Sequence, residues 1–437
     1  MIVSRNWAGK TFAVLGLARS GAATVSALLA SGADVLAWDD DAARREAVFA
    51  QWGHLSGERL FIDDFSDWID PEIDALIVSP GVPLNTHPLA AAARAAGVPV
   101  IGDIELFAQA HKDLPPHKVV GITGTNGKST TTALVHHILK TAGVPTLMGG
   151  NIGLPILRQE PLPEGGVYVL ELSSYQIDLT TSLDCDVAVL LNITPDHLDR
   201  YDGFAGYAAS KARLFAMQTA GHVAVVGTGD EASANIAQGL AGRTDDLVTI
   251  APDMVIDQRR WPALQGPHNA QNAQAAIAVA RALGIDAAAI EAGLASYASL
   301  PHRMQHVATR HGVAFVNDSK ATNPESTAPA LAAFPRVHWI VGGKRKGDDL
   351  DACAAHLDHV VAAYTIGEAA PLFFDLLKDK VPVVEQSGTL EAAVAHAAAA
   401  ARPGDTVLLS PACASFDQFR DYEARGDAFR AAVEALA

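Results

Sequence analysis

The chain has 437 residues and a formal net charge of −17; 49% of its residues are hydrophobic and 19% are charged. This length predicts two to four domains, the apolar content argues against disorder, and the acidic balance argues against nucleic acid as a main partner. Three widely spaced cysteines predict neither a disulfide framework nor a structural zinc site, and they fit a reducing cytosol. The first residues do not resemble a signal peptide and no apolar run is long enough for a membrane span, so we expect a cytoplasmic protein.

The N-terminal segment alternates short apolar runs with helical patterns, which predicts a parallel sheet with helices on both faces. A buried strand at Thr11–Leu17 leads through the glycine-bounded turn Gly16–Gly21 into a helix at Ser20–Ser31. Further strands are predicted at Val35–Trp38, Ala75–Val78 and Val98–Ile101. Adjacent prolines and charges in residues 112–118 (KDLPPHK) predict a linker, so the first domain is assigned to residues 1–111.

A second α/β unit is predicted to begin at Val119, where a strand, a glycine-rich loop and a helix follow one another. Its later strands are predicted at Val167–Leu170, Val187–Leu191, His222–Val226 and Leu247–Ile250. After a boundary near Leu300–Pro301, a third α/β unit has predicted strands at Ala314–Val316, His338–Val341, Ala363–Ile366 and Val407–Leu409. A charged helix from Asp421 closes the chain. The predicted fold is therefore α/β with three domains, at residues 1–111, 112–300 and 301–437.

The strongest local signal is the glycine-rich stretch Ile122–Thr130 (ITGTNGKST), between a predicted strand and a predicted helix. In such a loop the backbone N–H groups and the helix dipole surround phosphate oxygens. Lys128 can reach the β- and γ-phosphates of a nucleotide, and the hydroxyl of Ser129 can bind Mg²⁺. The strict pattern has a glycine six residues before the lysine, where this chain has Ile122, so the loop is a variant. The alternative is an ordinary turn with a chance Gly-Lys pair, which the strand–loop–helix context disfavours.

Four polar residues further along could complete such a site, and each has a plain structural alternative. Glu171 ends a predicted strand, where a metal ligand is expected, or it is a surface glutamate. His197 stands close to two aspartates, either as a ligand or in a capped turn. Lys211 lies on a predicted helix and, taken alone, is more simply a solvated lysine. Asn269 lies at a predicted helix start, where it could bind the edge of a base or only cap the helix.

Taken together, these motifs resemble the Mur ligase family over essentially the whole chain. The family's order and spacing are matched by TGTNGKST, ELSSYQ, NITPDHLDRY, the Lys211 helix, GPHNAQN, LPHR and NDSKATN. Within the family, GDIELF (residues 102–107), NDSKATN (317–323) and SPACASFDQFRDYEARG (410–426) are most similar to the members that add D-glutamate. The DNPR-type motif typical of members that add diaminopimelate or lysine is absent from the sequence.

The resemblance implies a Rossmann-like N-terminal domain for a UDP-sugar, a central P-loop-type ATPase domain, and a C-terminal dinucleotide-fold domain for glutamate. It implies an ATP-dependent carbon–nitrogen ligase of peptidoglycan precursor synthesis. That ligase joins D-glutamate to UDP-N-acetylmuramoyl-L-alanine (UDP-MurNAc-L-Ala) through an acyl phosphate. The resemblance further implies two Mg²⁺ ions, one held by Ser129 and Glu171, the other by His197 and a carbamate on Lys211. A monomer is expected.

The resemblance also assigns site residues by their positions in the motifs. Catalytic roles are expected for Lys128, His197 and Lys211. The nucleotide is expected to contact Gly124, Thr125, Asn126, Gly127, Lys128, Ser129, Thr130, Asn269, Arg303 and Asp318. The UDP-sugar is expected to contact Arg19, Ser20, Asp39, Gly81 and Asn151. D-glutamate is expected to contact Thr322, Lys346, Ser415 and Tyr422, the last of which replaces a phenylalanine common in the family.

One departure from the family concerns the expected uridine site. The chain has Asp39-Asp40-Asp41 where Asp-Thr-Arg often follows the second strand in the family. Three carboxylates facing a nucleotide would need a compensating cation. Arg19, Arg44 or Arg45 could supply that positive charge.

Three alternative functions stay open. A folylpolyglutamate-type ligase shares the phosphate loop and the carbamate chemistry, but it lacks the UDP-binding first domain that residues 1–111 predict here. A P-loop ATPase without ligase activity would not need Lys346 or the segment 410–419 (SPACASFDQF) as an acceptor site. A ligase for L-glutamate would look very similar, because the sequence does not fix the chirality of the acceptor.

Overall fold

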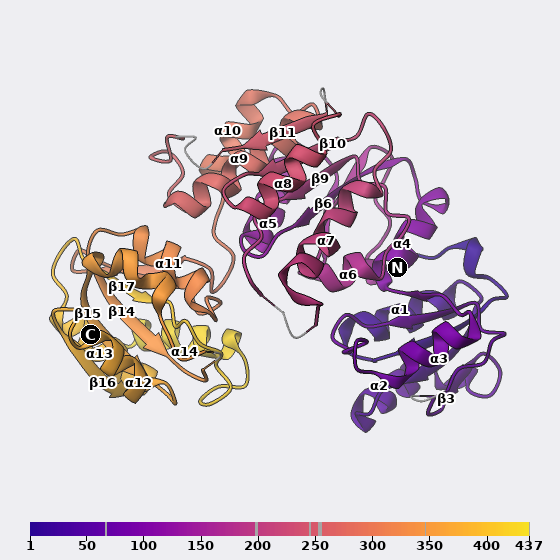
Figure 1. The fold of residues 1–437 in the computed structure, drawn as a ribbon, viewed down its shortest axis with the longest axis horizontal. Helices are drawn as coiled ribbons and strands as arrows, with labels where there is room; N and C mark the ends of the chain where they lie inside the picture. The colour runs from indigo at the N-terminus through magenta and orange to yellow at the C-terminus, as the bar shows by residue number, and fades with distance from the viewer. Residues whose placement is uncertain (66–67, 197–199, 244–245, 252–255, 346, 437) are drawn as a thin grey trace. The chain divides into compact units, whose positions relative to one another are not determined.

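The structure is a computed structural model of the chain, and it describes residues 1–65, 68–196, 200–243, 246–251, 256–345 and 347–436 (Figure 1). In this part of the chain the strands form three sheets that alternate with helices, which confirms the predicted α/β class. By the contacts between its residues the chain divides into two compact units: Met1–Met254 with Gln274–Gly293, and Val255–Ala273 with Leu294–Ala437. The first two sheets lie in the first unit and the third sheet in the second. The three domain ranges 1–111, 112–300 and 301–437 therefore stay predictions.

The first sheet is parallel throughout, with strand order β3-β2-β1-β4-β5. Its strands are β1 (Thr11–Leu15), β2 (Asp34–Trp38), β3 (Leu60–Ile62), β4 (Ala75–Val78) and β5 (Val100–Ile101). The helices of this segment are α1 (Arg19–Ala30), α2 (Ala42–Trp52), α3 (Pro88–Ala96) and α4 (Asp103–Ala110). Alternate residues of β1 enter two separate apolar clusters, Phe12 and Val14 in one, Ala13 and Leu15 in the other. Burial of both faces explains why the strands read as continuous apolar runs.

The second sheet is also parallel, with strand order β11-β10-β9-β6-β8-β7. Its strands are β6 (His117–Thr123), β7 (Thr146–Gly150), β8 (Gly166–Glu171), β9 (Val187–Leu190), β10 (Val223–Gly227) and β11 (Leu247–Ile250). The helices that follow its strands are α5 (Lys128–Thr141), α6 (Ser174–Asp178), α7 (Gly203–Ala216), α8 (Glu231–Gly239), α9 (Pro267–Ala282) and α10 (Ala287–Ser296). Because β6 lies between β8 and β9, the loops that follow these three strands leave the sheet at the same edge.

The third sheet has strand order β12-β13-β17-β14-β15-β16 and is parallel except for the edge pair β12–β13. Its strands are β12 (Gln305–Arg310), β13 (Val313–Asn317), β14 (Val337–Gly342), β15 (Val360–Ile366), β16 (Val384–Gly388) and β17 (Thr406–Leu409). Its helices are α11 (Pro324–Ala332), α12 (Ala370–Leu377), α13 (Leu390–Ala400) and α14 (Tyr422–Glu434). Neighbours along β14 again face opposite clusters, with Trp339 in one and Ile340 in the other. Asp421 accepts a hydrogen bond from the N–H of Ala424 and caps α14, where the sequence predicts the closing helix.

The predicted strands are present, with ends that differ by up to three residues. The strand predicted at Thr11–Leu17 ends at Leu15, and the strand predicted at Val98–Ile101 begins at Val100. Four further strands, β3, β7, β12 and β16, are not predicted from the sequence. Short 3₁₀ helices occupy Arg5–Trp7, Gly53–Leu55, His111–Asp113, Ile156–Arg158 and Asp351–His359. The predicted linker at residues 112–118 thus contains the end of a 3₁₀ helix and the start of β6.

The three cysteines, Cys185, Cys353 and Cys413, are buried and form no disulfide, as expected. Among the helices of the described residues, none has both the length and the apolar character that crossing a bilayer requires.

Candidate active site

The glycine-rich loop joins β6 to α5, as the sequence predicts. Gly124 and Gly127 have φ angles of +150° and +86°, which favour glycine at both positions. A Cβ on Gly124 would lie 3.1 Å from the Cβ of Leu191, so the loop runs close against the end of β9. The N–H groups of Thr125 and Asn126 donate to the backbone and side-chain oxygens of Asn192, at 2.9 and 2.8 Å. The loop is thereby fixed around the N-terminus of α5, which is the geometry of an anion site.

Lys128, the first residue of α5, folds over this loop. Its Nζ donates to the carbonyl oxygens of Gly124 and Thr125, both at 2.8 Å. Ser129, on the same helical turn, is buried. The ammonium group is therefore held at the loop, beside the N–H groups that would surround a phosphate.

Glu171 is the last residue of β8 and pairs in register with Ile122 of β6. Its side chain is only 2% exposed, so the alternative of a surface glutamate is wrong. Its Oε1 accepts a hydrogen bond from Asn151 Nδ2 at 2.8 Å, whereas its buried Oε2 has no hydrogen-bond partner among the described residues. A buried carboxylate oxygen without a donor suits a cation, and Mg²⁺ binds through one or two carboxylates with phosphate and water oxygens. Glu171 with the hydroxyl of Ser129 therefore fits the first expected magnesium site.

Lys211 lies on α7 and is 1% exposed, so the alternative of a solvated lysine is also wrong. Its Nζ donates to Gly124 O at 3.0 Å and Thr123 Oγ1 at 3.4 Å. Burial, and then the positive charge of Lys128, lower the pKa of Lys211 well below its ordinary value. The structure thus brings Lys211 to the phosphate loop as a buried amine that favours its neutral form.

The second expected magnesium site is only partly described. His197 lies outside the described residues. In the described residues no three His, Cys, Asp or Glu side chains gather as a metal cage. Ions at this site would rely on hydroxyl, phosphate and water oxygens, or on a modified Lys211, in addition to Glu171.

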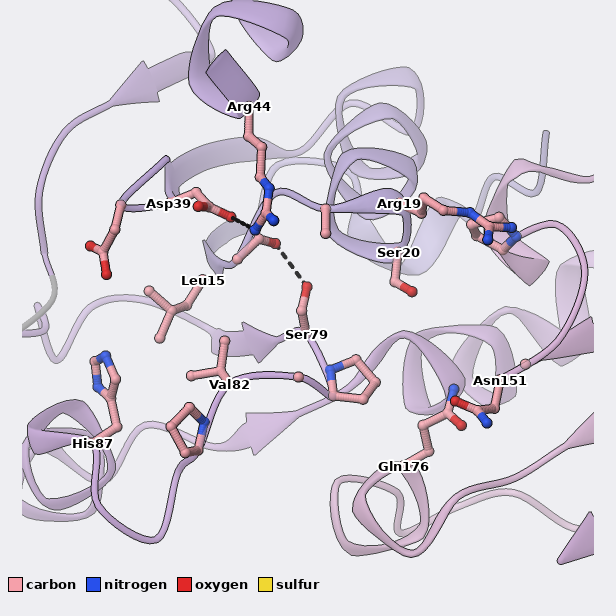
Figure 2. Close-up of a pocket in the computed structure, with 18 of the residues that line it drawn as sticks. Leu15, Arg19, Ser20, Asp39, Arg44, Ser79, Val82, His87, Asn151 and Gln176 are labelled. Atoms are coloured by element: carbon pink, nitrogen blue, oxygen red, sulfur yellow. Dashed lines mark hydrogen bonds and ion pairs between the residues drawn. The ribbon is translucent and has the colours of Figure 1, made fainter. Parts of the chain in front are cut away.

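A cavity of about 710 Å³ opens beside the first sheet (Figure 2). All five residues expected to contact a UDP-sugar line it, namely Arg19, Ser20, Asp39, Gly81 and Asn151. The resemblance did not point to Ser79, His87 or Gln176, which also line it. Ser79 directly follows β4, and His87 ends the connection from β4 to α3, so their position after a strand is the signal that could have found them. Gln176 is the last residue of the ELSSYQ motif, which gave it no role. Asn151 connects this cavity to the phosphate loop, because its side chain also donates to Glu171.

Two of the three aspartates after β2, Asp39 and Asp41, have side-chain partners, and both pair with Arg44. Asp39 accepts hydrogen bonds from the N–H groups of Leu17 at 2.7 Å and Asp41 at 2.9 Å, and from Arg44 Nη1 at 3.2 Å. Burial alone would raise the pKa of Asp39, but these donors outweigh it and hold the pKa below 3.8. Asp41 caps α2 through the N–H of Ala43.

Of the three arginines that could compensate the aspartates, Arg44 both lines the cavity and pairs with Asp39 (Figure 2). Arg45 instead donates to Asp39 O and places its guanidinium 4.3 Å from the centre of the Trp38 ring. Arg19 donates to Gly153 O. The ion pair between Arg44 and Asp39 offsets part of the negative charge at this end of the cavity.

In the second unit, Asp318 follows β13 and is buried. It accepts hydrogen bonds from the N–H of Met304 at 3.1 Å and from Ser410 Oγ at 2.9 Å. Burial raises the pKa of Asp318 to about 7. Arg303 lies between His302 and Met304, two residues with positive φ at the entry to this unit. Asn269 is buried in the first turn of α9, where its Nδ2 donates to Gln265 O at 3.0 Å. The nucleotide roles of these three residues stay predictions.

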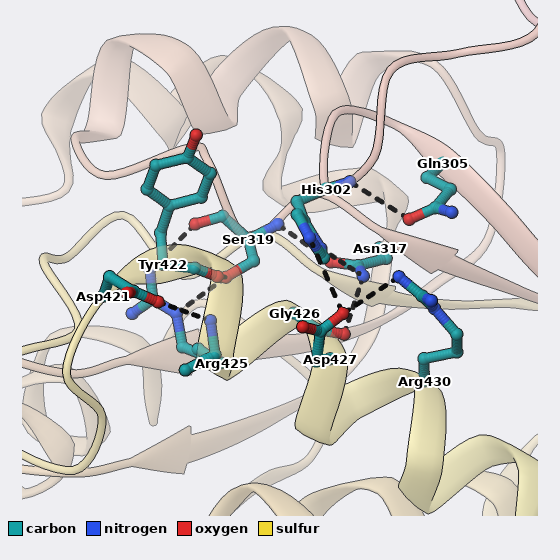
Figure 3. A network of polar contacts seen from close by, with 11 residues as sticks. His302, Gln305, Asn317, Ser319, Asp421, Tyr422, Arg425, Gly426, Asp427 and Arg430 are labelled. Atoms are coloured by element: carbon teal, nitrogen blue, oxygen red, sulfur yellow. Dashed lines mark hydrogen bonds and ion pairs between the residues drawn. The ribbon is translucent and has the colours of Figure 1, made fainter. Parts of the chain in front are cut away.

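Two of the predicted glutamate contacts, Thr322 and Ser415, lie on loops that Arg425 joins by hydrogen bonds. Figure 3 shows Arg425 beside Ser319 and Tyr422. This guanidinium is 1% exposed and donates to Ser319 O at 2.8 Å, Cys413 O at 3.0 Å and Ala414 O at 3.2 Å. Ser319 Oγ donates to Tyr422 O at 2.8 Å, so the loop after β13, which carries Thr322, is bonded to the start of α14. Ser415 follows the carbonyls that Arg425 binds. Lys346 lies outside the described residues.

The comparisons with known proteins agree with this geometry. Residues 122–262 match the Mur ligase middle domain, and residues 302–413 match the Mur ligase, glutamate ligase domain. The chain is 63% identical, over all of its length and 97% of the relative, to the UDP-N-acetylmuramoylalanine–D-glutamate ligase of Novosphingobium aromaticivorans. It is 62% identical to the protein of that name from Sphingopyxis alaskensis, with both chains covered completely.

Solved structures of related ligases share the fold. The UDP-N-acetylmuramate-alanine ligase MurC of Thermotoga maritima aligns with a TM-score of 0.59 at 18% identity, over 98% of this chain and 99% of that one. The MurF ligase of Thermotoga maritima, in complex with ADP, aligns with a TM-score of 0.60 at 18% identity, over 98% of this chain and 96% of that one. These likenesses support the fold alone.

Proposed function

The chain belongs to the Mur ligase family, and we propose on this premise that it joins D-glutamate to UDP-MurNAc-L-Ala with cleavage of ATP to ADP and phosphate. It is an ATP-dependent ligase of peptidoglycan precursor synthesis. The two relatives quoted above are named for the same two substrates, UDP-N-acetylmuramoylalanine and D-glutamate. We propose a cytoplasmic location for this ligase.

The reaction requires that a carboxylate be activated before it can form an amide. The γ-phosphoryl group of ATP passes to a carboxylate oxygen of the alanyl group, which gives an acyl phosphate and ADP. The amine of D-glutamate then attacks the acyl carbon, the C–O bond to phosphate breaks, and a proton leaves the new amide nitrogen. Both reactants are anions, so the site must supply positive charge where they meet.

The observation that carries the proposal is the position of Asn151. This residue lines the cavity beside the first sheet, and its amide donates at 2.8 Å to Glu171, next to the phosphate loop. A UDP-sugar with its diphosphate near Arg19 and Ser20 and its sugar near Asn151 would therefore direct its alanyl carboxylate toward the γ-phosphate. Such placement of both reactants accounts for a large part of the catalysis of a transfer reaction.

The residues at the phosphate loop supply the charge that the transfer needs. We propose that Lys128 binds the phosphates, and that Glu171 and Ser129 hold one Mg²⁺. When bound, Mg²⁺ would neutralise the negative charge shared between the phosphates and the carboxylate. The buried, neutral amine of Lys211 is the form that adds CO₂, so we propose that Lys211 becomes a carbamate and, with His197, holds the second ion.

The acceptor side belongs to the second unit. We propose that Lys346, Thr322 and Ser415 bind the carboxylates of D-glutamate, and that the ring of Tyr422 packs against its carbon chain. The hydrogen bonds of Arg425 support this proposal, because they fix the loops of Thr322 and Ser415 to each other. Asn269, Arg303 and Asp318 are the proposed contacts of the base, a phosphate and the ribose of ATP.

Phosphate release tests the proposed function. With ATP, Mg²⁺ and UDP-MurNAc-L-Ala, release should depend on added D-glutamate and should be much slower with L-glutamate. Faster release with L-glutamate would reassign the acceptor. Turnover with a folate substrate but not with the UDP-sugar would favour a folylpolyglutamate-type ligase. Release that needs neither acceptor nor UDP-sugar would indicate an ATPase without ligase activity.

A further inference from the structure

The cavity beside the first sheet has two chemically different parts. Figure 2 shows Arg19, Ser20, Asn151 and Gln176 together on one side, where Arg19 begins α1. A helix N-terminus with an arginine suits a diphosphate. The other side contains the apolar side chains of Leu15 and Val82, with polar groups around them (Figure 2). An apolar slot with polar groups at its rim suits a flat heterocyclic base.

His87 lies at the rim of this slot. It is half-buried, lines the cavity and is drawn on the same side as Leu15 and Val82 (Figure 2). It is also the N-cap residue of α3, where its Nδ1 accepts a hydrogen bond from the N–H of Leu89 at 3.2 Å. The role of His87 in the helix therefore uses one ring nitrogen and leaves the other for the cavity.

The helix cap fixes the tautomer of the neutral ring. Because Nδ1 accepts a hydrogen bond, it carries no proton, and a neutral imidazole then carries its proton on Nε2. In the described residues no protein group accepts a hydrogen bond from Nε2 of His87. His87 thus presents an N–H donor of fixed tautomer to the base end of the cavity.

We propose that His87 is a specificity residue of the nucleotide site, which donates its Nε2–H to O4 of the uracil base, the carbonyl oxygen that an amino group replaces in cytosine. This inference rests on the proposed function for the identity of the nucleotide. Uracil has two carbonyl oxygens, whereas cytosine has an amino group in place of one of them. A fixed donor therefore favours uracil, because the amino group of cytosine would face the N–H of His87 without an acceptor between them.

The test uses the substitution His87→Asn. Asparagine is a good N-cap residue, so α3 is kept, but its side chain is too short to replace Nε2. The KM values for UDP-MurNAc-L-Ala, ATP and D-glutamate are measured by phosphate release, and UDP and CDP are compared as competitive inhibitors against UDP-MurNAc-L-Ala. The exposed His54 gives a matched control, His54→Asn, and thermal unfolding reports the folded state of each variant.

We expect His87→Asn to raise the KM for UDP-MurNAc-L-Ala by about 3- to 10-fold, the effect of one hydrogen bond, with kcat and the other KM values unchanged. The preference of the wild-type protein for UDP over CDP should fall by a similar factor. His87→Gln, which restores an N–H donor, should recover part of the preference. His54→Asn should match the wild type in every measurement.

A UDP-to-CDP preference that is unchanged in a folded His87→Asn protein would overturn the inference, even if the KM for the UDP-sugar rises. Such a result would place the contact at the O2 carbonyl that both bases share, at the ribose or at a phosphate. A wild-type protein that does not turn over UDP-MurNAc-L-Ala would contradict the proposed function instead. In that case the binding of UDP and CDP by calorimetry still tests His87, because a preference for UDP that depends on His87 needs no turnover.

Discussion

The buried amine of Lys211 leads to a prediction about chemical rescue. Lys211→Ala removes a side chain that is 1% exposed and whose Nζ lies 3.0 Å from Gly124 O, within the phosphate loop. If this amine carries a carbamate, the substitution removes an anion with two oxygens from the proposed second magnesium site. If instead it acts as a plain cation, the substitution removes a positive charge.

The structure sets the size of both effects. Loss of the buried side chain leaves a cavity that costs about 2–5 kcal/mol of folding free energy, as for other large-to-small core substitutions, so the variant should still fold. Loss of residues that only orient a metal ligand lowers metal affinity or activity about 10- to 100-fold, so loss of a ligand itself should lower kcat by at least about 100-fold. Activity, not stability, is therefore the sensitive measurement.

The assay adds small acids and amines to the Lys211→Ala protein and follows phosphate release. Acetate and propionate should restore part of the activity, because a carboxylate can occupy the place of the carbamate. Lys112→Ala, at an exposed lysine, is the control and should show no response to either additive. Rescue by alkylamines, without rescue by carboxylates, would refute the carbamate and assign Lys211 a cationic role.

Three further predictions concern other parts of the chain. The pKa of Asp318 is about 7 in the folded protein, against 3.8 for the free side chain. Between pH 3.8 and pH 7 this carboxyl group therefore holds a proton in the folded state that it has lost in the unfolded state. The stability that this bound proton contributes is fully present below pH 3.8 and is lost as the pH rises through 7. In urea unfolding, the free energy of unfolding of the wild type should therefore fall by up to roughly 4 kcal/mol relative to that of Asp318→Asn over this range. If the unfolding free energies of the two proteins change with pH in parallel, the prediction is wrong. Lys346→Ala should raise the KM for D-glutamate by at least about 30-fold and the KM for ATP far less, with Lys344→Ala as the control; equal changes in both KM values would place Lys346 at the nucleotide. Glu105 accepts hydrogen bonds from Thr181 N at 2.7 Å, Ser182 N at 2.9 Å and Ser182 Oγ at 2.7 Å, so Glu105→Gln should lower the free energy of unfolding by about 2–4 kcal/mol. The exposed Glu164→Gln should leave it unchanged, and a similar loss in both variants would show that the three bonds to Glu105 add nothing specific.

The sequence predicts those parts of the fold that follow from local pattern. Strands buried on both faces, such as β4 and β9, are short apolar runs between turn residues, and helix α5 begins where the glycine loop ends. The strands that were not predicted lack this pattern. β12 is a polar edge strand, and β7 ends in two glycines, so both depend on pairing with a neighbour for their conformation. Propensity alone could not indicate them.

The sequence predicts the parts of the site that lie within one motif. It does not predict contacts between side chains that are far apart in the sequence. The phosphate loop and Glu171 at a strand end follow from the sequence. The burial of Glu171 and Lys211 does not, because it depends on how three strands and α7 pack together. The sequence also does not indicate which of three arginines pairs with Asp39. The choice depends on where helix α2 begins, because that start places Arg44, and not Arg45, against the carboxylate of Asp39.

The fate of one oxygen atom tests the central claim most directly. UDP-MurNAc-L-Ala labelled with ¹⁸O in its alanyl carboxylate is incubated with ATP, Mg²⁺ and D-glutamate, and the released phosphate is analysed by mass spectrometry. An acyl phosphate retains the labelled oxygen when its bond to carbon breaks, so each phosphate released should carry one ¹⁸O from a fully labelled substrate. Phosphate without the label would mean that water, and not the carboxylate, receives the phosphoryl group, and it would contradict the ligase mechanism.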